Sequence, residues 1–88
     1  MQKEIAREIV SRMQNCMKEL DDSVRIVQES CNDEELKAFR RGIGYVLSEL
    51  QDRITDPIFR EHMDLVPEGI DYAPLPGLTL AQIAAKSR

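Results

Sequence analysis

The feature that most constrains the fold is a run of apolar residues in the first third of the chain whose spacing alternates between four and three. Eight residues follow this rule without interruption, namely Ala6, Val10, Met13, Met17, Leu20, Val24, Val27 and Cys31. A mean spacing of about 3.5 residues places them on one line along a helix, here called the seam, which is typical of knobs-into-holes packing. The seam therefore predicts a long helix that needs partner helices.

The first helix is expected over about residues 2–30. Ile5, Ile9 and Cys16 lie beside the seam and make the apolar surface wider than one partner helix would cover. Eighty-eight residues form one small domain, for which long helices alone give a marginal core. We therefore expect contacts with two or more helices and assembly into a homodimer.

A second helix is predicted over about residues 33–55. Asn32 is a suitable N-cap, Glu35 stands where a capping box places its acid, and three carboxylates follow the cap. An apolar stripe then continues at helical spacing through Leu36, Phe39, Ile43, Val46, Leu47, Leu50 and Ile54. Because only two or three residues remain for the connection, the helices must fold back antiparallel. The fold class is thus all-α, with residues 1–64 forming a long helical hairpin that dimerises into a four-helix bundle.

Gly42 and Gly44 interrupt the second helix, and each costs about 1 kcal/mol relative to alanine in a helix interior. The first interpretation is close approach of another helix to the small patch formed by Ala38 and Gly42. The others are a ligand or peptide lying on bare backbone, and a local kink. The preceding Arg40 and Arg41 are interpreted as a solvated surface, with an anion site as the alternative.

A break or kink is predicted at Asp56-Pro57, because proline disfavours helical geometry in the residue before it and suits the first turn of a new helix. A short helix or a bent extension should follow. Residues 65–88 then form a tail containing proline and glycine. Within the tail, Thr79 and Gln82 match the capping-box pattern and predict a short helix over about residues 80–86.

The tail is too apolar for a solvating linker. Its apolar residues include Val66, Ile70, Tyr72, Leu75, Leu78, Leu80 and Ile83. Two interpretations follow: the tail packs on its own dimer, or it docks to another protein as an amphipathic segment.

His62 is the single histidine of the chain. A helical metal pair needs a second ligand three or four residues away, and those positions hold Ile58, Phe59, Leu65 and Val66. We therefore interpret His62 as a structural or exposed residue near a helix end, and expect no metal or cofactor.

The net charge of −4 argues against binding to nucleic acid or to anionic membranes, which requires Lys and Arg. No apolar run approaches the length of a membrane span, and the first residues carry no signal-peptide pattern. Cys16 and Cys31 lie too far apart on one helix for a disulfide, so they are interpreted as reduced, partly buried apolar residues. A cytoplasmic location is expected.

The stretch from Pro57 to Pro67 has the form P-I-x-x-x-H-x-x-L-x-P. Together with the helix around Gly42-Ile43-Gly44, it resembles small uncharacterised bacterial helical-hairpin proteins. The resemblance covers about the second half of the hairpin. It implies a bacterial cytoplasmic protein and supplies no catalytic residues.

Two classes of function are compatible with these patterns. The favoured class is a non-enzymatic protein–protein interaction or regulatory module that acts as a homodimer. The alternative is a small-molecule-binding or catalytic protein with its site near Gly42/Gly44 or His62. The candidate binding residues are Arg40, Arg41, Gly42, Gly44 and His62.

Overall fold

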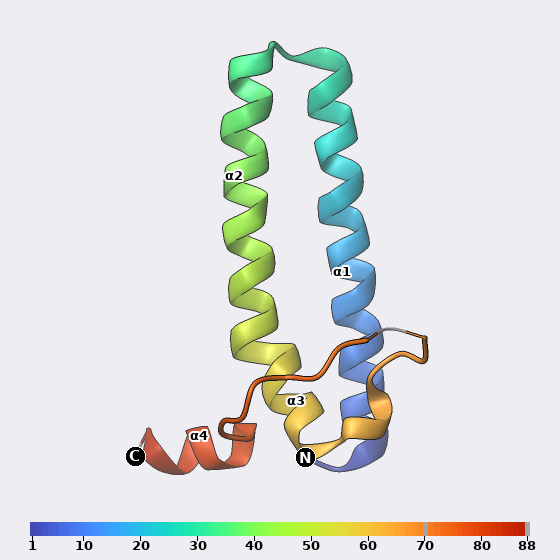
Figure 1. Ribbon diagram of the computed structural model, residues 1–88, viewed down its shortest axis with the longest axis vertical. Coiled ribbons are helices and arrows are strands. Elements are labelled where there is room, and N and C mark those ends of the chain that lie inside the picture. The colour runs from blue at the N-terminus through green and yellow to red at the C-terminus, as the bar shows by residue number, and fades with distance from the viewer. Residues whose placement is uncertain (70, 88) are drawn as a thin grey trace.

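The computed structural model describes residues 1–69 and 71–87 and consists of helices and connecting segments (Figure 1). Two long helices, α1 (Lys3–Ser30) and α2 (Asp33–Leu50), contact each other and run antiparallel. The shorter elements that follow are η1 (Gln51–Thr55), α3 (Asp56–Glu61), η2 (Met63–Leu65) and α4 (Leu80–Lys86). The described residues contain no β-strand. The predicted all-α helical hairpin is confirmed.

The tip of the hairpin is formed by the predicted N-cap. The Asn32 side chain accepts a hydrogen bond from the backbone N–H of Glu35, with 2.8 Å between Oδ1 and N. The carboxylates of Asp33, Glu34 and Glu35 occupy the first turn of α2, at the positive end of the helix dipole. The cap stops α1 and starts α2 within two residues, so the chain must reverse.

Contact between α1 and α2 covers the seam only in part. Ala6 and Val10 are the buried residues of α1, and the seam from Met13 to Val27 stays half-buried. The stripe on α2 is likewise half-buried, except for Val46, which is 49% exposed. None of the 18 residues of α2, all of them described, is buried. A two-helix hairpin therefore leaves much of its apolar surface in contact with water.

The chain does not break at Asp56-Pro57: it stays helical and bends there, with a π-helical turn just before Pro57. Pro57 has no backbone N–H, and its ring would clash with the carbonyl of Arg53 in a regular α-helix. The chain widens over Gln51–Thr55 instead, so that the N–H of Asp56 donates to the carbonyl of Gln51, five residues earlier. Backbone angles stay helical through Asp56, and α2 leads into α3 through a bend (Figure 1).

The core lies at the base of the hairpin, where α3 packs against the first turns of α1. Its buried apolar side chains are Ala6, Val10, Ile58 and Phe59. The five residues from Thr55 to Phe59 are all buried, including the polar Thr55 and Asp56. The π turn therefore places a continuous stretch of chain inside the core.

The last helix, α4, starts at the predicted capping box. The N–H of Thr79 donates to Oε1 of Gln82 at 2.9 Å, and the N–H of Gln82 donates to Oγ1 of Thr79 at 3.4 Å. Two N–H groups that no intrahelical carbonyl can reach are thereby satisfied.

Two further predictions concern surface properties. No helix in the described part of the chain has both the length and the apolar character that crossing a membrane requires. Cys16 and Cys31 are free, but both are exposed. The expectation that they are partly buried is therefore wrong for the single chain.

Candidate functional site

The chain between η2 and α4, here called the strap, comprises residues 66–69 and 71–79 of the described part. It crosses the base of the hairpin (Figure 1). Val66, Tyr72 and Leu80 pack against the core, so the apolar tail is seated on its own chain. Ile70, one of the apolar tail residues named above, lies outside the described residues.

Arg60 of α3 anchors the strap. Its Nε donates to the carbonyl of Leu75 at 2.7 Å, and its Nη1 donates to the carbonyl of Leu78 at 3.3 Å. Gly77 lies against the guanidinium group, and a Cβ atom at this position would stand only 2.7 Å from Cζ of Arg60. A side chain at position 77 therefore competes directly with the anchor.

We expect Gly77→Ala to displace the guanidinium and to lower the free energy of unfolding by about 1 kcal/mol, the net value of a typical hydrogen bond. The substitution should cost much less in an Arg60→Ala background, because the competing group is gone. A double-mutant cycle in urea measures this coupling. Equal costs in the two backgrounds would show that the strap is held by other contacts.

A second fastening joins the strap to the π turn through Tyr72. The Tyr72 hydroxyl donates to Oδ1 of Asp56 and lies 3.2 Å from Nε2 of Gln51, which donates to it. Its ring meets that of Phe59 edge-on, with centroids 6.1 Å apart and planes at 70°. Polar and aromatic contacts thus hold the same residue.

Asp56 is a buried carboxylic acid at the lower end of the hairpin, with 6% of its surface exposed. Burial raises its pKa above the ordinary value of 3.8, and the negative charge of Asp52 acts in the same direction. The positive charge of Arg60 opposes the shift without cancelling it. Ionised Asp56 is therefore a destabilising element of the folded protein.

The contribution of Asp56 to the free energy of unfolding depends on pH, because the folded and unfolded chains bind its proton with different affinity. Between 3.8 and the raised pKa of Asp56, the folded state binds this proton more tightly than the unfolded chain does. The contribution of Asp56 to stability therefore falls as pH rises through this window. Glu61 and Asp64 have lowered pKa values, held down by hydrogen bonds from the Met1 ammonium and from Lys3, respectively. Their contributions are lost as pH falls.

We expect Asp56→Asn to be more stable than wild type at pH 7, because asparagine still accepts from the Tyr72 hydroxyl and does not ionise. The difference should shrink as pH falls below the raised pKa of Asp56. Urea denaturation of both proteins across pH 4–8 measures it, and the effects of Glu61 and Asp64 cancel in the comparison. A difference that widened on acidification would contradict the burial of a charged Asp56.

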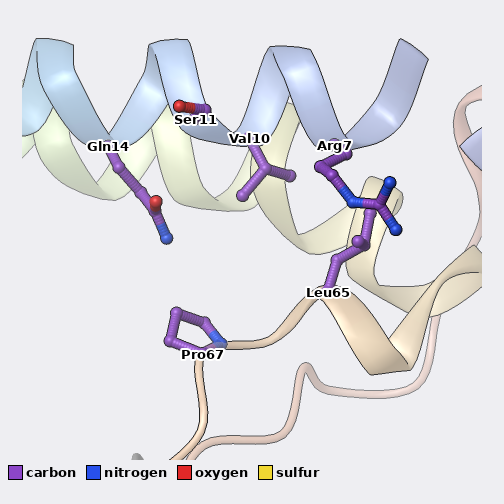
Figure 2. Close-up of a pocket in the computed structure, with 6 residues that line it drawn as sticks. All are labelled: Arg7, Val10, Ser11, Gln14, Leu65 and Pro67. Carbon is purple, nitrogen blue, oxygen red and sulfur yellow. The ribbon is translucent and has the colours of Figure 1, made fainter. Parts of the chain in front are cut away.

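Two small cavities are lined in part by Pro67. One, of about 290 Å³, is lined by Arg7, Val10, Ser11, Gln14, Leu65 and Pro67. Figure 2 shows the side chains of Val10 and Gln14 extending from α1 toward Pro67. The other, of about 270 Å³, is lined by Met17, Gln51, Thr55, Phe59, Pro67 and Tyr72. Both volumes are just below the range of about 300–1,000 Å³ usual for small-molecule sites.

His62 is engaged in tying the first residue to the base. Its Nε2 lies 2.8 Å from the carbonyl oxygen of Met1 and 3.0 Å from Oε1 of Glu61. The Met1 ammonium pairs with the same Glu61 oxygen at 2.8 Å, and Lys3 pairs with Asp64. These contacts give His62 a structural role at the end of α3. Within the described residues, no group of three or more His, Cys, Asp or Glu side chains is arranged to hold a metal.

The other candidate residues lie elsewhere. Arg40, Arg41, Gly42 and Gly44 are exposed positions in the middle of α2, whereas His62 follows α3 at the base. No described atom approaches within 4 Å of a Cβ built at Gly42 or Gly44. The close helix contact expected at Gly42 is therefore not made within this chain. The structure does not bring the candidate residues into one site.

Sequence reasoning did not identify the residues that organise the base. Arg60 had no special pattern, and Asp56 was interpreted only as a helix boundary. Gly77 carried a usable signal, because it follows Pro76 in a segment that must turn closely around another part of the chain. The contact it makes with Arg60 spans 17 residues and has no local signature.

Comparison with known proteins adds no further constraint: no family model, no curated protein and no solved structure matches this chain.

Proposed function

We propose that this chain is a non-enzymatic protein–protein interaction module that acts as a homodimer. The observation that carries the proposal is the surface the single chain exposes, 6738 Å². A compact monomer of 10.1 kDa exposes about 5,300 Å². The radius of gyration, 15.5 Å, likewise exceeds the value of about 12 Å for a compact domain of this length.

The excess is of the right size for a dimer. It amounts to about 1,400 Å² per chain, and a standard protein interface buries about 800 Å² on each partner. The half-buried seam of α1 and the stripe of α2 supply apolar surface in this area. Burying it would contribute about 25 cal/mol for each Å² of apolar surface. A second hairpin offers the same surface in return.

Sedimentation equilibrium of the full chain at micromolar concentration tests the proposal. We expect a species of twice the 10.1 kDa chain mass. The thermal midpoint should also rise with protein concentration, because association stabilises the folded state by mass action. A well-folded monomer whose midpoint did not depend on concentration would contradict the proposal.

Other features support the same class of function. The strap is fastened to α3 by Arg60 and Tyr72, which favours packing on its own chain over docking elsewhere. Leu75, at 76% exposure, is an apolar strap residue available to a further protein partner. The exposed free cysteines suit the reducing cytoplasm, which we propose as the location.

The alternative, a small-molecule or catalytic site near Gly42/Gly44 or His62, has weaker support. His62 already contacts Met1 and Glu61 through Nε2, and open space surrounds Gly42 and Gly44. Neither arrangement converges polar groups on a cavity, as a binding site for a small molecule would.

A further inference from the structure

The two sides of the hairpin differ in chemistry. Residues seven apart lie almost on one line of a helix, because two turns span about 7.2 residues. On one side of the seam, the line consists of polar residues, namely Arg7, Gln14, Asp21 and Gln28. On the other side, the line consists of small or apolar residues, namely Ile9, Cys16 and Ser23. The difference indicates that the two sides of the hairpin make different contacts.

The strap lies beside the base end of the polar side, whose four residues stay exposed. Arg7 and Gln14 line a cavity together with Leu65 and Pro67, as Figure 2 shows. Ile9 and Cys16 each stand two residues beyond a member of the polar line, which turns them by about 200° around the helix. They therefore lie on the side of α1 away from the strap, where Ile9 is half-buried against the core and Cys16 is exposed.

The second helix has the same asymmetry. Gln51 marks the strap side, because it bonds to Tyr72 and lines the cavity beneath it. Val46 is turned about 140° from Gln51, and Gly42 about 180°. Phe39 lies seven residues before Val46, on the same line. The side of α2 away from the strap is thus apolar or small in its middle, with Glu35 and Glu49, each seven residues from Gly42, at its two ends.

We infer that the side opposite the strap docks a second copy of this chain in antiparallel orientation, with the tip of each hairpin over the base of the other. This surface, called the strap-free face, consists of Ile9, Cys16, Phe39, Gly42 and Val46. The inference rests on the proposed homodimer and adds its face and direction. It also supplies the close contact for Gly42 that the single chain lacks.

A second copy fits this face better than an unrelated partner of unspecified shape, because the unburied area matches what a dimer needs. The face also has the self-complementary form that a two-fold dimer requires, with apolar or small residues on the same side of both helices, flanked on α2 by Glu35 and Glu49. Small residues such as Gly42 permit the interaxial distances of about 8 Å found at the lower end of helix packing.

The antiparallel direction follows from the charge at the tip. Glu29, Asp33, Glu34 and Glu35 crowd around the turn between the helices, with Lys37 as the nearby cation. A parallel dimer would bring these carboxylates within about 10 Å of those of the second copy, a distance over which salt does not fully screen repulsion. An antiparallel dimer separates the two tips by about 40 Å, the length of α1.

The positions of the two native cysteines distinguish an antiparallel dimer from a parallel one. Cys16 stands near the middle of α1, so an antiparallel pair with full overlap brings it beside Cys16 of the second copy. Cys31 stands at the tip, so only a parallel pair brings it beside its counterpart. Both thiols are exposed in the single chain, so access to oxidant does not favour either one.

The experiment compares two variants of the full chain, Cys31→Ser and Cys16→Ser, under mild oxidation with copper phenanthroline. We expect Cys31→Ser, which keeps Cys16, to form covalent dimers about tenfold faster, because a disulfide needs Cα atoms within about 7 Å of each other. The same reaction in urea is the control, where the two variants should react at similar rates.

Each outcome separates the inference from the proposed homodimer. Faster cross-linking through Cys31 would establish a parallel pair and overturn the inference while the homodimer stands. Equal rates in a protein that sediments as a dimer would place the interface on another face and also overturn the inference. Equal rates in a protein that sediments as a monomer would overturn both proposals.

Discussion

Replacement of Phe59 by alanine is expected to lower the free energy of unfolding by about 3–5 kcal/mol, the usual cost of removing a buried aromatic side chain. Phe59 is 7% exposed and belongs to the core that joins α3 to α1. Its ring also meets that of Tyr72, so its loss should loosen the strap as well. Urea denaturation followed by circular dichroism measures the effect.

The matched control is Arg12→Ala, which should change the free energy of unfolding by no more than about 0.5 kcal/mol. The Arg12 side chain is 69% exposed and pairs with Glu8, one turn earlier on the same helix. Exposed pairs of this kind contribute little. If the two substitutions moved the denaturation midpoint equally, the base would not be the core of the protein.

The hairpin was predictable because its determinants are local. The seam needs only the helical period, and the turn needs only the cap at Asn32 with the acidic residues after it. The same holds for α4, whose capping box is contained in Thr79 to Gln82. In each case, residues within a few positions of one another decide the structure.

The position of the core could not be predicted in this way. The seam is uniform from Ala6 to Val27, yet full burial occurs only at its first turns, where α3 and the strap add further layers. The position of α3 and the strap depends on the backbone conformation around Pro57, and proline is compatible with a break, a kink or a π turn. The packing of the base selects the π turn, which buries Asp56 beside Tyr72.

The candidate site was less accessible to sequence reasoning than the fold. In the sequence, Gly42 and Gly44 stand out as departures from a helical pattern, Arg40 and Arg41 as an alternative anion site, and His62 as the single histidine. A site requires side chains to converge, and convergence arises from contacts between distant parts of the chain. The anchors that do converge, Arg60 on Leu75 and Tyr72 on Asp56, join positions 15 and 16 residues apart.

Substitution of Val46 by aspartate is expected to convert the proposed dimer into monomers. Val46 is 49% exposed in the single chain, so the monomer should tolerate the change. On the strap-free face, the same carboxylate would be buried without a partner, at a cost of about 3–5 kcal/mol. This corresponds to a dissociation constant raised by more than about 100-fold, since each 1.4 kcal/mol is tenfold. Sedimentation equilibrium over a range of concentrations measures it.

Gln28→Asp is the control that isolates position from charge. It adds the same carboxylate to the same hairpin, but on the polar line of α1 that lies on the strap side, where Gln28 is exposed. An antiparallel second copy on the strap-free face does not cover that line, so the dissociation constant should stay within a few-fold of wild type. Dissociation by both variants would mean that net charge opposes association. Dissociation by Gln28→Asp alone would place the second copy on the strap side, because only a covered residue incurs the cost of desolvating its charge.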